Sequence, residues 1–236
     1  MLPGGMPFYG FDIGIIMLNN DCPRPVGDIG NAATWPFPVL YEVVEDAVPS
    51  RVVENAAEGL LPDFVTAARR LERAGVRGIT TSCGFLAIFQ RELAAAVTVP
   101  VAASSLLQVP VALRSLSDER RVCVLTINAQ TLGPRHFRGV GVTDREFERV
   151  VVVGLEDSEH LYGALVGGSR ALDVEAAERE LVDAARRAVA EDGSIGAFVF
   201  ECTNLPPYSA AVRAALNRPV WDTVTLVRSF RAALLG

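Results

Sequence analysis

The chain contains one sequence pattern twice. In each half, an apolar or β-branched run ends at a cysteine, Cys83 or Cys202, and a proline follows 17 positions later, Pro100 or Pro219, at the start of another short apolar run. An amphipathic helical pattern precedes each cysteine-ending run. Repetition at half the chain length predicts two copies of one unit, in the order helix, strand, cysteine, helix, strand.

Strands that alternate with helices indicate parallel sheets, because parallel strands need a crossover connection. We therefore expect an α/β protein of two pseudo-symmetric lobes, with the active site in the cleft between them. The first lobe is predicted to comprise residues 1–104 and 222–236, and the second residues 105–221.

The pattern also predicts individual elements. The expected strands or extended pieces are 11–18, 39–47, 52–55, 78–82, 99–103, 121–127, 150–153, 196–201 and 219–221. The expected helices are 60–73, 86–97, 129–137, 174–190, 207–216 and 223–235. Residues 104–116 are expected to cross between the lobes, and residues 154–172 to form a loop with one helical turn.

Each of the paired cysteines follows the carboxyl end of a predicted strand, which is where ligands bind in open α/β sheets. Each also precedes a predicted helix, whose amino-terminal dipole favours a thiolate over a thiol. An ordinary core cysteine is the alternative for either position alone, because buried thiols are common. The pairing of Cys83 with Cys202 favours the functional interpretation.

All 22 basic residues are arginine, which excludes mechanisms that need a lysine. Schiff-base chemistry, including that of pyridoxal phosphate (PLP), Walker-type phosphate loops and Ser–Lys pairs are thereby ruled out. The two histidines and four scattered cysteines form no metal-binding pattern, and no Gly-x-Gly-x-x-Gly follows the first strand. Neither a metal nor another cofactor is expected.

The net charge of −6 argues against nucleic acid and anionic membranes as partners. No apolar stretch approaches the length that spans a bilayer, and Met1-Leu2-Pro3-Gly4-Gly5 lacks the pattern of a secretion signal. Scattered cysteines suit the reducing cytosol. We expect a cytoplasmic protein whose partner is a small carboxylate-bearing substrate, and a homo-oligomer such as a dimer is left open.

Two thiols that face one cleft from opposite sides can exchange protons with both faces of a substrate carbon. A free thiol has a pKa of about 8.5, which a helix terminus lowers, so a thiolate base and a thiol acid can coexist near neutral pH. We predict Cys83 and Cys202 as the catalytic residues. The backbone N–H groups after them, with the hydroxyls of Ser82 and Thr203, are predicted to bind the substrate carboxylate.

Three segments together resemble the aspartate/glutamate/hydantoin racemase superfamily: Thr81-Ser82-Cys83-Gly84, Gly27-Asp28-Ile29-Gly30-Asn31 and residues 201–208. The resemblance covers nearly the whole chain from about Phe11. It implies two flavodoxin-like lobes related by a pseudo-twofold axis, a cofactor-independent isomerase that needs no PLP, and an acid/base pair of cysteines. It also implies carboxylate binding just after each cysteine, by Gly84, Phe85, Thr203 and Asn204.

The chain departs from the best-known members of that superfamily. Glutamate racemases usually follow their cysteines with Asn-Thr and Thr-His, whereas this chain has Gly84-Phe85 and Thr203-Asn204. They also usually carry Asp-Ser near the end of strand one, where Asn19-Asn20 stands here. These departures argue against glutamate itself, and the sequence does not decide among glutamate, aspartate, a hydantoin or another carboxylate as the substrate.

The resulting functional prediction is a racemase or epimerase in amino acid metabolism that uses two thiols at Cα. A maleate-isomerase-like cis–trans isomerase with a cysteine nucleophile is one alternative, because such enzymes keep both cysteines. A non-catalytic small-molecule-binding protein that kept the cleft is another. Arylmalonate decarboxylases keep only the second cysteine, so Cys83 argues against their chemistry.

A loop rich in glycine and proline, residues 24–38, follows the first strand and is placed to touch a ligand. Asn31 and Thr34 in this loop, with Asn19 before it, are further predicted substrate-binding residues. Glu201 adjoins a catalytic cysteine, but strand alternation points it to the other face. A structural hydrogen bond is its favoured role, and an effect on the neighbouring pKa or binding of an ammonium group is the alternative.

Overall fold

The computed structural model describes residue 5 and residues 8–235. The prediction that no secretion signal is present was made from residues 1–5, most of which lie outside the described residues. The first and last residues of the predicted first lobe also lie outside them. No helix in the described part of the chain is long and apolar enough to cross a membrane.

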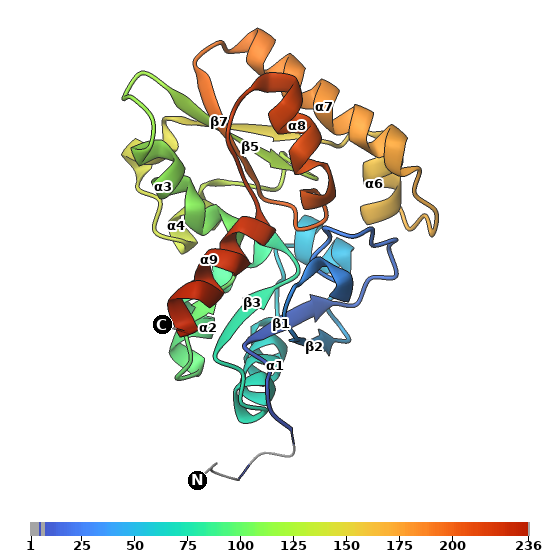
Figure 1. The fold of residues 1–236 in the computed structure, drawn as a ribbon, viewed down its shortest axis with the longest axis vertical. Coiled ribbons are helices and arrows are strands. Elements are labelled where there is room, and N and C mark those ends of the chain that lie inside the picture. Colours follow the sequence, from blue (N-terminus) through green and yellow to red (C-terminus); the bar gives the residue numbers. More distant parts are fainter. Residues whose placement is uncertain (1–4, 6–7, 236) are drawn as a thin grey trace.

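Two four-stranded parallel sheets form the centre of the molecule, with helices around them (Figure 1). Their strand orders are β2-β1-β3-β4 and β6-β5-β7-β8, so the same order occurs twice. The strands are β1 (Ile13–Leu18), β2 (Val39–Val44), β3 (Gly78–Thr81), β4 (Val101–Ala102), β5 (Arg121–Thr126), β6 (Val150–Gly154), β7 (Ile195–Phe200) and β8 (Val220–Trp221). The α/β fold class with two lobes is confirmed.

The α-helices are α1 (Leu61–Arg73), α2 (Gln90–Ala96), α3 (Val109–Arg114), α4 (Pro134–Gly139), α5 (Asp144–Phe147), α6 (Glu159–Leu165), α7 (Val174–Glu191), α8 (Ser209–Leu216) and α9 (Thr223–Leu235). Short 3-10 helices are η1 (Ala32–Thr34), η3 (Gly84–Phe89), η4 (Ser105–Gln108) and η5 (Pro206–Tyr208), and η2 (Ser50–Glu54) is one π-helical turn. Strands β1, β3 and β7 are buried along their whole length, as expected for parallel strands covered on both faces.

The carboxyl-terminal helix α9 lies beside the first sheet, although β5 to β8 precede it in the chain (Figure 1). Gly78 of β3 allows this contact, because a Cβ there would lie 2.6 Å from Leu234 and 2.8 Å from Phe230. Val227 of α9 is buried in one cluster with Ile13 of β1. The exact residues at which the lobes divide stay a prediction.

Hydrogen bonds join the two places where the chain crosses between the sheets. Gln108, at the end of η4, donates to the backbone oxygen of Asp222 at 2.9 Å and accepts from the Thr225 hydroxyl at 3.1 Å. Ser209 of α8 donates to the Asp222 carboxylate at 2.6 Å. These buried bonds hold the sheets in the relative position that forms the site.

Three expected elements are wrong in detail. Residues 52–55 are not extended but lie mostly in η2, where Val52 and Val53 turn inward into the core. The helix expected over 129–137 begins only at Pro134, because the side chain of Asn128 accepts from the N–H of Gln130 and closes a turn there. The expected loop 154–172 contains the helix α6, whose Leu161 is buried.

Candidate active site

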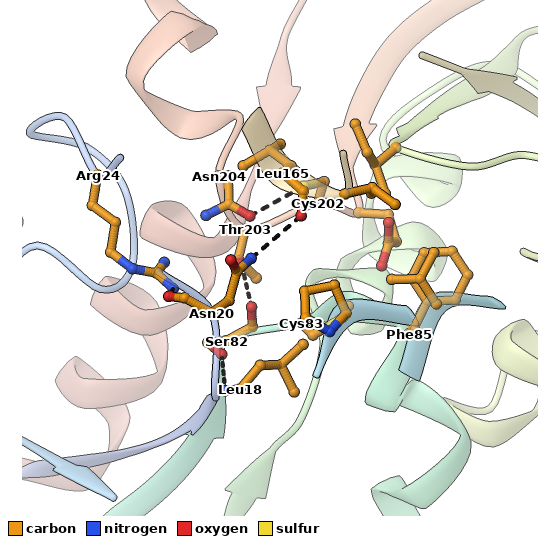
Figure 2. A pocket seen from close by; sticks show the side chains of 16 residues that line it. Leu18, Asn20, Arg24, Ser82, Cys83, Phe85, Leu165, Cys202, Thr203 and Asn204 are labelled. Atoms are coloured by element: carbon orange, nitrogen blue, oxygen red, sulfur yellow. Dashed lines mark hydrogen bonds between the residues drawn. The ribbon is translucent and has the colours of Figure 1, made fainter. Parts of the chain in front are cut away.

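A small pocket lies where β1, β3 and β7 end. Both predicted catalytic cysteines and the polar residues beside them line it (Figure 2). The remaining wall is apolar and consists of Leu18, Pro49, Val53, Ile127, Leu165 and Val166.

Cys83 follows β3 in an extended conformation and precedes η3. The N–H groups of Phe85 and Leu86 point at its sulfur, an arrangement that favours a thiolate. Burial nevertheless raises the pKa of the Cys83 thiol, and the negative charge of Glu201 raises it further. The loss of solvation outweighs the two N–H groups, so Cys83 is a thiol at rest.

Cys202 follows β7 and is also buried. Its thiol donates to Asn204 Oδ1 at 3.6 Å (Figure 2), and the backbone N–H of Asn204 also faces its sulfur. Burial and then the charge of Glu201 raise the pKa of Cys202 well above its usual value. The sequence-based expectation that helix termini lower these pKa values is therefore wrong. The position of a thiol before a helix does not show how far the site is desolvated, and here desolvation is the larger effect.

Asp28 connects the loop after β1 to the Cys202 loop. Its fully buried carboxylate accepts from Arg24 Nη1 at 2.9 Å, from the Gly30 N–H at 2.7 Å and from the side-chain amide of Asn204. The hydrogen bonds continue from Asn204 to the Cys202 thiol. Arg24 lines the pocket and carries the positive charge nearest the thiols among the residues that line it.

The predicted carboxylate-binding residues Ser82, Gly84, Phe85, Thr203 and Asn204 all line the pocket. Several of their donors are already engaged. The Thr203 hydroxyl donates to the Ser82 backbone oxygen at 2.6 Å, and the N–H groups of Phe85 and Asn204 face the thiols. The predicted role of the Thr203 hydroxyl in binding substrate is therefore corrected to one of joining the two cysteine loops.

Three predicted substrate-binding residues do not line the pocket. Asn19 is exposed and its amide donates to the Glu45 backbone oxygen at 3.0 Å. The Asn31 amide donates to the backbone oxygen of Arg24 at 2.8 Å. The Thr34 hydroxyl donates to the backbone oxygen of Asp28 at 2.7 Å. Asn31 and Thr34 shape the loop that presents Arg24, because their polar groups satisfy its backbone.

Sequence reasoning did not place several lining residues. Asn20 lines the pocket instead of its neighbour Asn19, because the chain leaves the sheet after Leu18 and alternation no longer applies. Its amide donates to the Leu165 backbone oxygen at 3.3 Å. Leu165 ends α6, in the segment expected to be mainly loop. The apolar face of α6 was the signal that could have revealed it.

Glu201 also lines the pocket, although it is adjacent to Cys202 in the chain. Strand β7 ends at Phe200, so the predicted alternation of faces fails at this point. Glu201 Oε2 accepts from the Thr126 hydroxyl at 2.7 Å, so Glu201 does make a structural hydrogen bond, the role that the sequence favoured without naming a partner. Burial raises the pKa of Glu201 to about 8, partly offset by that hydrogen bond.

The other two cysteines lie outside this pocket. Cys123 is completely buried within β5, and Cys22 is buried in the same loop after β1 that carries Arg24. Among the residues that the structure describes, no three His, Cys, Asp or Glu side chains are gathered so that they could hold a metal ion. What the pocket can do follows from two thiols, one neutral carboxyl group and one guanidinium.

Residues 44–228 match the profile of the Asp/Glu/Hydantoin racemase family. The chain is 36% identical to dimethylsulfoniopropionate lyase 7 of Emiliania huxleyi, over 94% of this chain and 67% of that protein. It is 31% identical to the dimethylsulfoniopropionate lyase of Durusdinium sp. clade D, over 90% of this chain and 71% of that protein. It spans 60% of lyase 3 of E. huxleyi, to which it is 35% identical over 94% of its own length.

Solved structures share the fold at lower identity. An aspartate racemase of Picrophilus torridus matches with a TM-score of 0.58 and 16% identity, over 95% of this chain and 93% of that one. A glutamate racemase of Bacillus anthracis matches with a TM-score of 0.61 and 14% identity, over 95% and 81%. An arylmalonate decarboxylase matches with a TM-score of 0.57 and 18% identity, over 94% and 92%. These three similarities show that the fold is shared and nothing about function.

Proposed function

This chain belongs to the Asp/Glu/hydantoin racemase family, and on that premise we propose that it is a lyase that deprotonates the carbon next to a carboxylate and expels a group from the following carbon. Dimethylsulfoniopropionate is the proposed substrate, because the relatives reported above are named as lyases of this compound. The observation that carries the proposal is one pocket in which two buried thiols share apolar walls with a guanidinium.

The proposed reaction is a β-elimination. The substrate is a propionate with a dimethylsulfonium group on Cβ. A cysteine thiolate takes the proton from Cα, and the electron pair of that C–H bond forms the Cα=Cβ double bond. The Cβ–S bond breaks, and its electron pair leaves with sulfur as neutral dimethyl sulfide. The products are acrylate, dimethyl sulfide and a thiol that returns its proton to solvent.

The burial of the thiols is compatible with this reaction. Cys83 and Cys202 are protonated at rest because burial raises the pKa of both thiols. A sulfonium cation in the pocket attracts a thiolate, so binding of the substrate lowers those pKa values. A thiolate formed from a weakly acidic thiol is also a strong base. The base is therefore produced where the substrate is bound.

The pocket walls favour a sulfonium over an amino acid. The methyl groups of a sulfonium donate no strong hydrogen bond, so Leu165 and Val166 can surround them without leaving polar atoms unpaired. The Phe85 ring can attract the cation through its face. An α-ammonium group needs acceptors, but the Asp28 carboxylate already accepts three hydrogen bonds. Free N–H groups of Arg24 would meet the substrate carboxylate.

The test is to incubate the purified protein with dimethylsulfoniopropionate, and to measure dimethyl sulfide by gas chromatography and acrylate by proton NMR. We expect equal amounts of both products. Cys83→Ser and Cys202→Ser together should lower the rate by at least about 100-fold, the usual size of general acid–base contributions. Cys123→Ala is the matched control, because this buried thiol lies outside the pocket. Undiminished cleavage by the double variant, or no cleavage by the wild type, would falsify the proposal.

A second candidate is the two-thiol racemisation or epimerisation at Cα, favoured by the specific observation that both thiols line one pocket. Elimination needs a single base, whereas racemisation uses an acid and a base on opposite faces of the carbon. Proton–deuterium exchange at Cα in heavy water, across a panel of amino acids and hydantoins, distinguishes the two. Exchange without release of a β-substituent would favour this candidate over the lyase.

A further inference from the structure

Glu201 has no exposed surface and stands where β7 ends and the pocket begins. Its Oε2 accepts from the Thr126 hydroxyl at 2.7 Å, whereas its Oε1 has no hydrogen-bond partner among the described residues. Leaving a buried polar atom unpaired costs about 1–3 kcal/mol. An unpaired buried oxygen needs an explanation, and Glu201 belongs to the lining of the pocket, where a bound ligand can complete its hydrogen bonding.

Gly84 makes room for this carboxyl group. A Cβ at position 84 would overlap both Oε1 and the backbone oxygen of Glu201. Oε1 thus lies against the residue that follows Cys83, while the backbone of Glu201 continues directly into Cys202. The carboxyl group stands between the loops that carry the two thiols.

The carboxyl group is neutral at pH 7, because burial raises the pKa of Glu201 to about 8. The Thr126 hydroxyl donates to Oε2, so the carboxyl proton belongs on Oε1. The unpaired atom is then an O–H donor rather than a charged acceptor. Burial thereby converts an acidic residue into a neutral hydrogen-bond donor in the pocket wall.

Several polar side chains around the pocket already donate to acceptors within the protein. The Arg24 guanidinium and the Asn204 amide both donate to Asp28, and the Thr203 hydroxyl donates to the backbone oxygen of Ser82. The Arg24–Asp28 pair adds no net charge. An ionised glutamate at the pocket wall would repel a substrate carboxylate, whereas a neutral one binds it.

We propose that Glu201 is a catalytic hydrogen-bond donor that acts in its neutral form, with its Oε1–H directed to the carboxylate of the substrate. This role rests on the proposed function and identifies a donor for its substrate. When a base removes the Cα proton, negative charge spreads onto the carboxylate oxygens, and a donor fixed in a dry site stabilises that charge more than it stabilises the ground state. Glu201 keeps its proton throughout. Burial also keeps carboxylic acids neutral for hydrogen-bond donation in other active sites.

The pH dependence of this role depends on the groups that face Glu201. The titratable ones are the thiols of Cys83 and Cys202, whose pKa values lie far above 8. Strand β5 presents the hydroxyl of Thr126, and η4 presents that of Ser105, which donates to the Glu201 backbone oxygen at 3.3 Å. Glu201 is therefore the group that titrates near pH 8 in this part of the site.

The first experiment compares Glu201→Gln with Glu201→Leu. Glutamine keeps an acceptor for Thr126 and a neutral donor in place of Oε1–H, so we expect activity within a few-fold of the wild type at pH 7. Wild-type activity should fall as pH rises through about 8, and the Glu201→Gln variant should lack that fall. Glu201→Leu should lose at least about 100-fold in kcat, as when an oxyanion donor is removed. A Glu201→Gln variant as inactive as Glu201→Leu overturns the proposal, because a carboxylate would then be required.

The second experiment needs no turnover. Infrared difference spectra of wild type against Glu201→Gln should show a protonated-carboxyl band at pH 7, and this band should disappear near pH 8. Glu42→Gln is the control, because Glu42 forms an ion pair with the exposed Arg70, and this substitution should leave the band unchanged. Acrylate affinity, measured by calorimetry, should fall above pH 8 in the wild type and not in Glu201→Gln. If dimethylsulfoniopropionate is not cleaved but both signatures occur, the proposed function fails and the donor role stands. If the substrate is cleaved and the carboxyl band is absent, the donor role fails alone.

Discussion

The carboxylate of Asp28 and the side-chain amide of Asn204, 176 positions apart in the chain, are hydrogen-bonded to each other. Asn204 in turn accepts from the Cys202 thiol at 3.6 Å, and Asp28 accepts from Arg24 at 2.9 Å. One continuous series of contacts therefore joins the loop after β1 to the thiol after β7. The position of the Arg24 charge and the position of the Cys202 proton are set together.

Asp28→Asn should destabilise the protein, because it leaves the largely buried Arg24 without its counter-ion. Breaking a buried ion pair costs about 3–5 kcal/mol, and we expect the lower end because 17% of the Arg24 side chain is exposed. Urea unfolding measures the change. Asp21→Asn is the control, since its pair with Arg170 is largely exposed and should contribute little. Equal effects of both substitutions would contradict the structural role of Asp28.

The thiols of Cys83 and Cys202 should react slowly with iodoacetamide at pH 7 in the absence of substrate. Burial raises the pKa of each thiol, so the thiolate fraction is small and grows with pH. The rate at each cysteine, followed by mass spectrometry of the digested protein, should still be rising at pH 9. A plateau near pH 7 at either cysteine would show a thiolate at rest and contradict this account.

Gly84→Ala should impair both folding and activity. The added Cβ would overlap the backbone oxygen of Glu201, which cannot swing away as a side chain can. Overpacking of this kind costs about 1–3 kcal/mol, and here it also displaces the carboxyl group beside the thiols. Gly133→Ala is the matched control, because a Cβ at that position meets no atom within 4 Å. Chemical unfolding and the cleavage assay should separate the two variants.

Glu201 should make the protein less stable as pH rises from about 4.5 to 8. Its folded pKa of about 8 lies above the ordinary value of 4.5, so within this range the folded state binds a proton that the unfolded state has released. The free energy of unfolding therefore falls with pH, by at most about 1.4 kcal/mol per pH unit for one proton. Urea unfolding of Glu201→Gln across this range should lack that contribution. Parallel pH profiles for variant and wild type would contradict the assignment.

His136 should have the opposite effect in acid. It is completely buried, with its ring edge-on to Phe85 at 5.3 Å between centroids, and burial lowers its pKa from 6.5 to about 4. Between pH 6.5 and 4 the unfolded state binds a proton that the folded state does not, so stability falls as pH falls. His136→Gln should flatten that part of the profile. His160→Gln, at a half-exposed histidine, serves as the control.

The prediction of membership in the racemase superfamily, made from the cysteine segments, is confirmed by the family match. The prediction of an enzyme is supported at the level of that family, while the isomerase class stays a prediction beside the lyase proposed here. The sequence named the correct superfamily because the Cys202 segment is specific. It did not select a reaction, because the reaction depends on which charges meet the substrate.

The positions of the strands and of the cysteines that follow them can be predicted from the local sequence. Apolar runs that end at Cys83 and Cys202 predict the buried strands β3 and β7, and the helix expected over 223–235 is observed as α9. These features depend on neighbours along the chain, whose periodicity is visible in the sequence.

The protonation of the site residues and their hydrogen-bond partners depend on how distant parts of the chain pack together. Asn20 rather than Asn19 lines the pocket because the chain turns after β1, and Glu201 lines it because alternation ends with β7. The pKa values of the thiols and of Glu201 are raised because both sheets together exclude water from this space. Solvation is a property of everything that surrounds a group, so it cannot be obtained from the few residues beside that group in the sequence.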